Sequence, residues 1–281
     1  MSMRNLPVAD IGTKPGVRSD ISQKALSRWT SDLKASTNDE TTISILDVIG
    51  SDLWGDGVSA KRIAGALRAI GDRPVTVTIN SPGGDVFEGL AIYNLLREHP
   101  AEVTVKIIGL AASAASFIAM AGDKIEIAKS GFFMIHNSWV IAMGDRHALR
   151  DVAEWLEPFD ASMAEIYADR SGQTSDALVT MMDKETWIGG KDAVDMGFAD
   201  EFLPRDQVSV NPGDDSASAL RAERMFDVMA SRAGVTKSAG RDILASLKGG
   251  TSGAALTGMS GAADIEAGVA DLLAQLKSFT E

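Results

Sequence analysis

The chain has 281 residues, of which 45% are hydrophobic and 23% charged, so it is long enough to bury a substantial core. Its formal net charge of −12 argues against a general nucleic-acid binder, which needs a basic surface. The absence of cysteine excludes disulfides, thiol nucleophiles and cysteine–zinc sites, and the three histidines argue against a histidine-rich metal centre. We therefore expect no metal and no cofactor.

The N-terminal arm, residues 1–40, is polar and mixed, and one helix is expected in it over 19–35. It lacks the apolar region of a secretory signal, and no apolar run in the chain approaches the ~18 residues that span a bilayer. These features predict a cytoplasmic protein with no membrane partner and no nucleic-acid partner.

From residue 41 to residue 204, strand and helix patterns alternate along the chain. The predicted elements are a strand over 41–49, a helix over 59–70, a strand over 75–79, a helix over 87–97, a strand over 103–108, a helix over 113–120, strands over 124–128 and 132–135, a helical stretch over 146–170 interrupted at Pro158, and a short helix over 192–196. This alternation indicates an α/β fold with a largely parallel sheet and crossover helices.

The composition changes after about residue 204. Residues 205–281, the C-terminal extension, are rich in alanine, glycine and serine, with a flexible segment at 248–253 and amphipathic helices expected over 221–231 and 265–279. We interpret the extension as a low-complexity, partly helical tail outside the core. It has either an assembly or scaffold-like role or the role of a disordered solubilising segment. The predicted domains are thus 1–40, 41–204 and 205–281.

A glycine pair follows the strand predicted over 75–79, in the sequence Asn80-Ser-Pro-Gly-Gly84. Adjacent glycines free the backbone to turn its N–H groups into an oxyanion hole or a phosphate nest. The alternative is a plain turn between a strand and a helix.

Small residues fill the next strand-to-helix junction, from Gly109 to Ser116. Ser113 lies at the predicted helix start, where free N–H groups and the helix dipole favour negative charge. The alternative role for Ser113 is that of an ordinary N-cap.

A histidine, His136, ends the short apolar strand predicted over 132–135. A lone histidine there is more often structural than catalytic, but a serine at a helix start, a histidine at a strand end and a later acid are the parts of a nucleophile–base–acid set. The acid is expected in the segment from Asp183 to Trp187, where the sequence leaves Asp183 and Glu185 as alternatives.

Residues 41–204 resemble the Clp protease proteolytic subunit, ClpP, and more closely the ClpP-like head-maturation proteases of tailed phages. The matching stretches come in the family's order and at similar spacing: INSPGG (79–84), GLAASAASFIAMAG (109–122), FFMIHNS (132–138) and ETWIGGKDAVDMGFAD (185–200). The resemblance implies a crotonase/ClpP-like fold and serine endopeptidase activity.

The resemblance also implies residue roles. Ser113 matches the nucleophile, with Ser116 one helical turn on as a weaker candidate, and His136 matches the general base. Glu185 stands where the family pattern has an aspartate, and Asp183 is the alternative acid.

Backbone groups are matched in the same way. The N–H groups of Gly84 and Ala114 correspond to the two oxyanion donors. Gly83 and Ser138 are expected to bind the substrate.

The implied biological role is cleavage of capsid or scaffold proteins in phage head maturation, in the host cytoplasm or the prohead. The resemblance implies a homo-oligomeric ring, since similar proteins join rings through a helix-and-strand handle at this place in the chain. An apolar stripe on the helical stretch over 146–170 fits either such an interface or the core: Leu149, Val152, Leu156, Phe159, Met163 and Ile166. By the same resemblance, we hypothesise that the protease cleaves its own C-terminal extension. The alternative role is that of a Clp-type subunit working with an ATP-dependent unfoldase. The unfoldase would be a separate protein, because this chain has no Walker A motif of its own.

Three other functions compete with the serine endopeptidase. A crotonase-type acyl-CoA hydratase or isomerase shares the fold and a backbone oxyanion hole, but would not need Ser113 with His136. An assembly protein with a degenerate protease core is conceivable because Glu185 replaces an aspartate. A signal peptide peptidase with a Ser–Lys dyad fits poorly, because it requires a membrane anchor.

Overall fold

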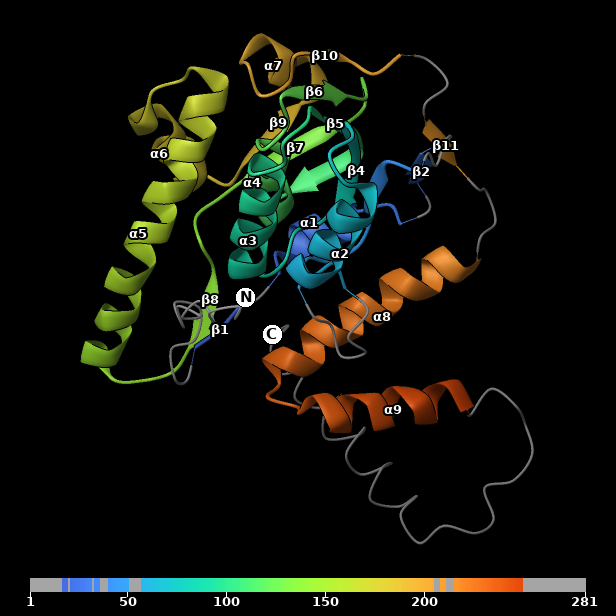
Figure 1. Ribbon diagram of the computed structural model, residues 1–281. Helices are drawn as coiled ribbons and strands as arrows, with labels where there is room; N and C mark the ends of the chain where they lie inside the picture. Colours follow the sequence, from blue (N-terminus) through green and yellow to red (C-terminus); the bar gives the residue numbers. More distant parts are fainter. Residues whose placement is uncertain are drawn as a thin grey trace, which may run out of the picture.

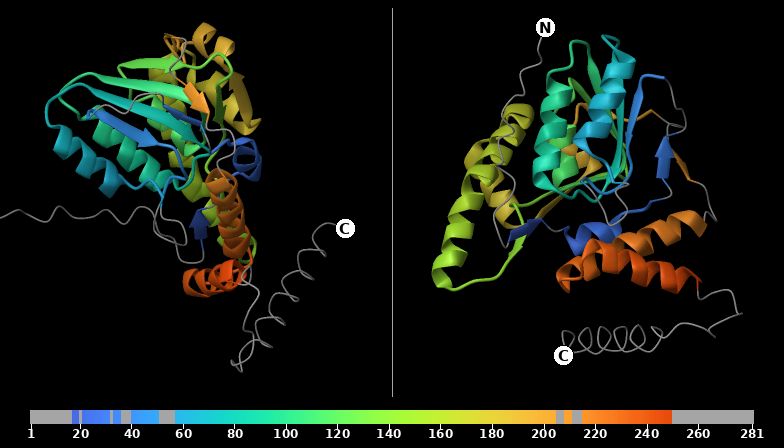
Figure 2. Two further views of the ribbon diagram at one scale, coloured as in Figure 1. Left: turned by 90° about the vertical axis from the view of Figure 1, so that its right-hand side faces the viewer. Right: turned by 60° about the horizontal axis from the view of Figure 1, so that its bottom comes forward.

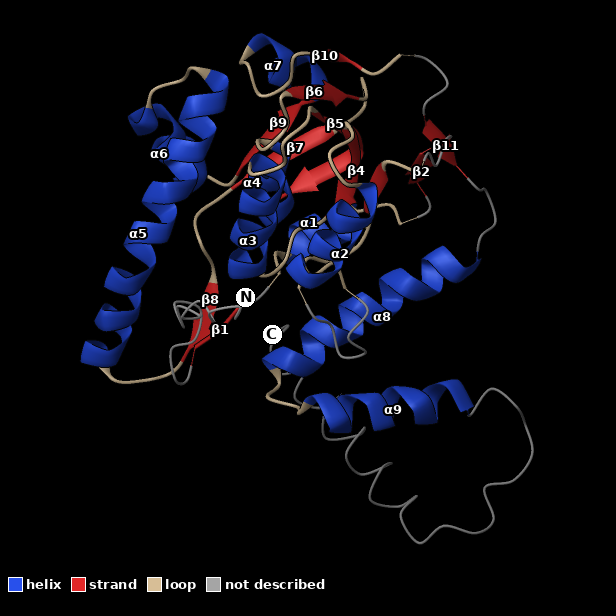
Figure 3. Ribbon diagram, viewed as in Figure 1, coloured by secondary structure: helices blue, strands red, loops and turns tan. Residues whose placement is uncertain are grey.

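The computed structural model describes residues 17–19, 21–31, 33–35, 40–50, 57–204, 208–210 and 215–249. A seven-stranded sheet forms the centre, and two short two-stranded sheets lie at its margins (Figures 1 and 3). Within these ranges, no helix combines the length and apolar character needed to cross a lipid bilayer.

The central sheet is mostly parallel, as predicted. Five strands run parallel in the order β10–β6–β5–β4–β3, β7 pairs parallel with the end of β5, and β9 pairs antiparallel with β7. The strands are β3 (Thr42–Ile45), β4 (Val75–Ser81), β5 (Val103–Ala112), β6 (Lys124–Ile127), β7 (Phe132–Ile135), β9 (Thr186–Gly189) and β10 (Glu201–Phe202). β5 extends beyond the predicted 103–108, because its small residues 110–112 pair with β7 after β6 has ended.

Helices α2, α3 and α4 lie together against the sheet (Figure 1), and α5 and α6 form an antiparallel pair beside them (Figure 2). The bounds are α2 (Ala60–Ile70), α3 (Val86–Arg97), α4 (Ala114–Ala119), α5 (Arg146–Ser171), α6 (Ser175–Asp183) and α7 (Gly190–Asp195). Helix α6 has no counterpart among the predicted elements.

Helix α5 corrects one prediction, because it runs through Pro158 without interruption. Proline removes one backbone donor and usually kinks a helix. Here Pro158 lies on an exposed side of α5, where water can bond the carbonyl that loses its partner, and Ser162 Oγ donates a hydrogen bond to the Pro158 carbonyl at 2.8 Å.

The helix predicted over 19–35 is also wrong in extent. This segment contains β1 (Val17–Ser19), the short helix α1 (Gln23–Arg28) and β2 (Leu33–Ala35). β1 pairs antiparallel with β8 (Val140–Ala142) and β2 with β11 (Val208–Val210). These long-range pairings explain the difference, because tertiary contacts override local helix propensity.

The two faces of the sheet bury separate clusters. Alternate residues of a strand point to opposite faces, so β5 sends Ile107 and Ala111 into the main cluster, which α2, α3 and α4 cover. Leu110 and Ala112 point the other way, into a second cluster with Ala25, Leu26, Trp29, Met134 and Val228. Besides residues of β5 and β7, the second cluster contains residues of α1, the adjoining Trp29 and Val228 of α8, a helix that lies in the C-terminal extension.

The extension contains α8 (Asp215–Arg232) and α9 (Lys237–Gly249) within the described residues. The sequence placed the extension outside the core, whereas Val228 of α8 is buried in the second cluster. Helix α8 is longer than the predicted 221–231, and α9 was not predicted. The helix expected over 265–279 and residues 250–253 of the flexible segment lie outside the described residues.

Candidate active site

Ser113 occupies a sharp turn between a buried strand and a buried helix. β5 ends at Ala112 and α4 begins at Ala114, so Ser113 alone makes the junction, with φ of 52° and ψ of −123°. Such a conformation costs a non-glycine residue about 1–3 kcal/mol and persists only where its surroundings fix it. Here the Ser113 N–H donates to the Met134 carbonyl at 2.8 Å, and the turn presents the side chain outward.

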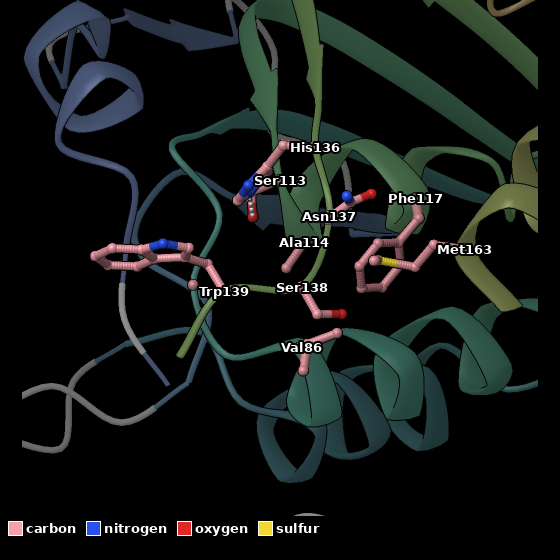
Figure 4. A pocket seen from close by; sticks show the side chains of 10 residues that line it. Val86, Ser113, Ala114, Phe117, His136, Asn137, Ser138, Trp139 and Met163 are labelled. Carbon is pink, nitrogen blue, oxygen red and sulfur yellow. Dashed lines mark hydrogen bonds between the residues drawn. The ribbon is translucent and has the colours of Figure 1, made fainter. Parts of the chain in front are cut away.

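The parallel pairing of β5 with β7 places His136 beside Ser113. Ala112 lies opposite Met134 in the register, so the residues that follow each strand end emerge at the same edge of the sheet. His136 Nε2 is 2.7 Å from Ser113 Oγ, and the two side chains face each other (Figure 4). A serine hydroxyl and an imidazole nitrogen at this distance can exchange a proton.

The charge state of His136 suits a base. Burial lowers the pKa of the His136 imidazole below its ordinary value, while the negative charge of Glu185 acts in the opposite direction. Since burial is the larger cause, the ring is neutral at pH 7 and its Nε2 can accept the Ser113 proton.

The two candidate acids have different partners. Glu185 precedes β9, whose Thr186 is paired with Ile135, so the turn at Glu185 lies beside His136. Its charge acts on the imidazole, and its Oε1 lies 3.1 Å from Lys24 Nζ. Within the described residues, no carboxylate oxygen is hydrogen-bonded to the His136 ring, so Glu185 acts on it through charge in this conformation.

Asp183 is oriented by a different residue. Its Oδ1 accepts a hydrogen bond from Asn137 Nδ2 at 2.8 Å. The charge of Glu185, by contrast, raises the pKa of the His136 imidazole.

Ser116 has a structural environment. Its side chain is fully buried, and its Oγ donates to the Ser113 carbonyl at 2.5 Å. The same Oγ lies 2.7 Å from the Tyr167 hydroxyl, which then acts as the donor. Because both hydrogen bonds hold the Ser116 hydroxyl inside the protein, it is not positioned to attack a substrate.

The glycine pair lies directly against the nucleophile. Gly83 has φ of +90°, and a Cβ on it would lie 2.6 Å from Ser113 Cβ, so the close approach requires glycine. Ile49 N–H donates to the Gly83 carbonyl and Asp85 N–H donates to the Ile49 carbonyl. Ile49 and Gly84 form a parallel bridge in which the residues on either side of Gly84 bond to Ile49, so the backbone groups of Gly84 itself point away from Ile49. The Ala114 N–H belongs to the first turn of α4, where it has no acceptor within the helix.

A small pocket of about 20 Å³ joins these groups. Gly84 and Ala114 border it together with Ser113 and His136. Its remaining walls are Val86, Phe117, Asn137, Ser138, Trp139 and Met163 (Figure 4).

The predicted substrate-binding residues are divided between the wall and the layer behind it. Ser138 lines the pocket, and its N–H donates to Asp160 Oδ1 at 2.6 Å, whereas Gly83 lies behind Ser113. Sequence reasoning missed the apolar wall residues Val86, Phe117 and Met163. The first two follow the glycine pair and the serine closely, but Met163 comes from α5, where the apolar stripe marked it as buried without indicating that it reaches the pocket.

Comparison with known proteins places this geometry in a family. The model of the Clp protease family matches residues 54–206, which include the glycine pair, Ser113, His136 and Glu185. The ATP-dependent Clp protease proteolytic subunit 1 of Corynebacterium jeikeium is 30% identical over 133 residues, which cover 47% of this chain and 71% of the relative. The ATP-dependent Clp protease proteolytic subunit of Bacteroides fragilis is also 30% identical over 133 residues, covering 47% of this chain and 64% of the relative.

A solved structure supports the fold. A ClpP1 variant from Listeria monocytogenes superposes with a TM-score of 0.51 at 24% identity, over 60% of this chain and 95% of that chain. The predicted ClpP-like α/β fold is thereby confirmed. Together, the family match over more than half of the sequence and the shared fold show that the chain belongs to the Clp protease family.

Proposed function

We propose that this protein is a serine endopeptidase in which Ser113 is the nucleophile and His136 the general base. The observation that carries the proposal is the 2.7 Å contact between Ser113 Oγ and His136 Nε2 at a strained strand-to-helix turn. A conformation of this kind is retained where it exposes a reactive side chain in a fixed orientation.

Acylation follows from the positions of these groups. Neutral His136 takes the Ser113 proton while Oγ attacks the carbonyl carbon of a peptide bond, and the electron pair of the C=O bond moves onto oxygen. The N–H groups of Gly84 and Ala114 receive this oxyanion. The resulting imidazolium then protonates the leaving amine as the C–N bond breaks, and an acyl-enzyme remains on Ser113.

Deacylation repeats the sequence with water. His136 takes a proton from the water as the water oxygen attacks the ester carbon. It then returns that proton to Ser113 Oγ as the bond between Oγ and the acyl carbon breaks and the carboxylic acid product leaves. Glu185 is the third member of the set, because its negative charge stabilises the imidazolium that forms in both steps. The alternative acid, Asp183, is engaged with Asn137.

The pocket indicates which side chain precedes the cleaved bond. Val86, Phe117 and Met163 make one wall of the pocket apolar. We therefore expect an apolar side chain to be preferred over a charged one at the residue that precedes the cleaved bond. Ser138 is the proposed contact for the substrate main chain, whereas the N–H and carbonyl of Gly83 are both hydrogen-bonded within the protein, so Gly83 acts by allowing the close approach to Ser113.

The proposed substrates are capsid or scaffold proteins of a phage head. This assignment is supported by the resemblance of the four sequence stretches and by the C-terminal extension, which follows the residues that the family model matches. The alternative is a Clp-type subunit that acts with an ATP-dependent unfoldase, as the names of the relatives indicate for those proteins. Cleavage of an unfolded capsid or scaffold protein by the purified chain without ATP, and no stimulation by a Clp unfoldase, would favour the first role.

A homo-oligomeric ring is part of the proposal. The apolar stripe of α5 is divided: Met163 is buried in the core, Phe159 contacts the ring of Phe87 at 5.1 Å between centroids, and Leu149 is 46% exposed. The exposed end of α5 is thus available for a contact between subunits. Native mass spectrometry of wild-type protein and of Leu149→Asp tests this assignment, and a wild-type monomer at micromolar concentration would contradict it.

Active-site labelling tests the central proposal. A fluorophosphonate should form an adduct on Ser113 of wild-type protein, fail to do so in Ser113→Ala, and react much more slowly in His136→Ala. Ser116→Ala is the matched control, because it removes a hydroxyl one helical turn away and should still be labelled. No labelling of folded wild-type protein would instead favour the acyl-CoA enzyme or a catalytically inactive assembly protein.

A further inference from the structure

A buried arginine links the C-terminal extension to the loop before α2. Arg224 of α8 is only 4% exposed, and it lies beyond the residues that the family model matches. Its Nε donates to Asp47 Oδ1 at 2.9 Å and its Nη2 to Asp47 Oδ2 at 2.7 Å, so the guanidinium grips the carboxylate with two parallel hydrogen bonds. Such a fork fixes the orientation of a carboxylate as well as its position.

Hydrogen bonds continue from Asp47 to the glycine pair. The Asp47 carbonyl accepts a hydrogen bond from Ser81 Oγ at 2.6 Å. Ser81 Oγ in turn accepts one from the Gly83 N–H at 3.1 Å. Ser81 is fully buried, so neither of its hydrogen bonds can be replaced by bulk water without opening the structure.

The backbone after Asp47 also holds the glycine pair. Ile49 N–H donates to the Gly83 carbonyl at 2.8 Å, and the Ile49 carbonyl accepts from Asp85 N–H at 3.0 Å. A Cβ on Gly84 would lie 2.0 Å from the Ile49 carbonyl oxygen, so the two segments are in direct contact. A displacement of residues 47–49 therefore moves the Gly84 N–H as well.

A second set of contacts links α8 to the segment that carries the glycine pair. Val228 of α8 packs with Trp29, and Trp29 Nε1 donates to the carbonyl of Asn80 at 2.8 Å, next to Ser81. Figure 2 shows α8 beside α1. Helix α8 thus contacts both supports of the segment that carries the glycine pair.

We propose that Arg224 is a positioning residue for catalysis, acting through Asp47 and Ser81 to hold the Gly84 N–H where it receives the oxyanion. The inference rests on the proposed peptidase function, and it makes α8 of the extension a working part of the site. An oxyanion donor contributes only when it is aligned within a few tenths of an ångström, because its hydrogen bond must strengthen as charge develops on the substrate oxygen. Loss of the fork relaxes Asp47 without touching Ser113 or His136.

The test compares Arg224→Gln and Asp47→Asn with wild-type protein on a chromogenic peptide ester. We expect kcat to fall by at least about tenfold in both variants, with KM changed by less than about twofold. The reason is that the weakened hydrogen bond, from the Gly84 N–H to the oxyanion, is formed only in the transition state. The dissociation constant of a peptide boronate, whose tetrahedral adduct places an oxygen in the oxyanion site, should rise by the same factor. Binding of an uncleaved peptide to the same variants in a Ser113→Ala background should be unchanged.

Arg221→Gln is the matched control. Arg221 lies one turn before Arg224 on α8 and donates to the Ser27 carbonyl of α1, so its loss removes a contact of the same helix without reaching Asp47. We expect wild-type kcat and wild-type boronate affinity in this variant. An equal loss in Arg221→Gln and Arg224→Gln would overturn the proposal in favour of a general docking role for α8.

Hydrogen exchange separates this proposal from the proposed function. The amides of Ser81, Gly83, Gly84 and Asp85 should exchange faster in Arg224→Gln and Asp47→Asn than in wild-type protein or Arg221→Gln, whether or not the protein cleaves peptides. Inactive, unlabelled wild-type protein would end the peptidase proposal while leaving this measurement interpretable. Unchanged exchange together with unchanged kcat in Arg224→Gln would show that the glycine pair does not depend on α8.

Discussion

In the described part of the chain, two turns at the edge of the central sheet hold a residue other than glycine at positive φ. Ser113 has φ of 52° between β5 and α4, and Glu185 has φ of 49° between α6 and β9. Both flank His136, one through a hydrogen bond and the other through its charge. They nevertheless differ in what surrounds them.

The serine turn is enclosed by the core. Ala112, Ala114 and Ser116 are all buried, and the Ser113 N–H and carbonyl are both hydrogen-bonded within the protein. The acid turn is at the surface: Glu185 is 27% exposed, and its carboxylate is paired with the ammonium of Lys24, which is 71% exposed. The nucleophile is thus fixed by packing, whereas the acid can exchange partners with solvent and with Lys24.

This difference predicts an order of effects. Removal of the Ser113 hydroxyl should abolish nearly all catalytic activity, because packing holds this group in its reactive position. Substitutions at the acid turn change only the electrostatic environment of His136, so they should lower the activity by smaller factors.

The largest effect is expected for Ser113→Ala. The covalent pathway is lost with the hydroxyl, so kcat/KM on a peptide ester should fall by a factor on the order of 10³ or more. Circular dichroism should show a folded protein, because the alanine keeps the Cβ against which Gly83 packs. Retention of more than a few per cent of wild-type kcat/KM would mean that the serine turn is not the reactive centre.

The second effect is a loss of activity in acid. Burial lowers the pKa of His136, so the ring stays neutral until the pH falls below about 6.5 and then takes up a proton. kcat/KM should accordingly be constant near neutral pH and fall as the pH drops through that lowered pKa. The unfolded chain binds this proton more readily than the folded protein, so the free energy of unfolding should also decrease as the pH falls below about 6.5.

Glu185→Gln should have an intermediate effect on catalysis. The substitution removes the charge that stabilises the imidazolium, and kcat should fall by about tenfold to a hundredfold, less than for an acid hydrogen-bonded to its histidine. Because the charge of Glu185 raises the pKa of His136, the acid limb of the pH–rate profile should move to lower pH.

Asp183→Asn is the control for that experiment. Its amide can still accept a hydrogen bond from Asn137, so kcat should change by less than about threefold and the acid limb should not move. The reverse result, with Asp183→Asn impaired and Glu185→Gln normal, would make Asp183 the third member of the set.

Ser116→Ala should leave catalysis nearly intact and lower stability. Without the Ser116 hydroxyl, the fully buried Tyr167 hydroxyl loses its hydrogen-bond partner, which costs about 1–3 kcal/mol. Urea denaturation of Ser116→Ala and of Ser116→Ala/Tyr167→Phe measures this. The double variant should recover part of the loss, and a kcat reduced as strongly as in Ser113→Ala would contradict a structural role for Ser116.

The sequence predicted Gly84, Ser113 and His136 at the ends of regular elements, and the structure brings all three to one pocket, while their catalytic roles stay predictions. A parallel α/β sheet brings the residues after its strands to one edge, which explains why they meet. The choice between Asp183 and Glu185 could not be made from the sequence, because Asp183 ends α6 and Glu185 follows only two residues later.

Contacts between distant segments could not be predicted at all. Arg224 and Asp47 are 177 residues apart in sequence, and neither has a neighbour that marks it. The pairing of β1 with β8 and the bond between Ser116 and Tyr167 are of the same kind. A local pattern reports the face of a helix or strand that is buried, but not the residue that it will meet.

The smallest effect is expected at Lys24, on the exposed side of the acid turn. Lys24→Met removes the cation that pairs with Glu185, so the carboxylate is free to turn toward His136 and its charge acts on the imidazole more strongly. The acid limb of the pH–rate profile should move slightly to higher pH, and kcat should change by less than about twofold, because exposed ion pairs contribute little. The Lys24→Met/Glu185→Gln double variant should match Glu185→Gln alone, since Lys24 affects the site only through that carboxylate. A lower kcat in the double variant than in Glu185→Gln would mean that Lys24 supports the site by a separate contact, and that the acid turn is more firmly built than its exposure indicates.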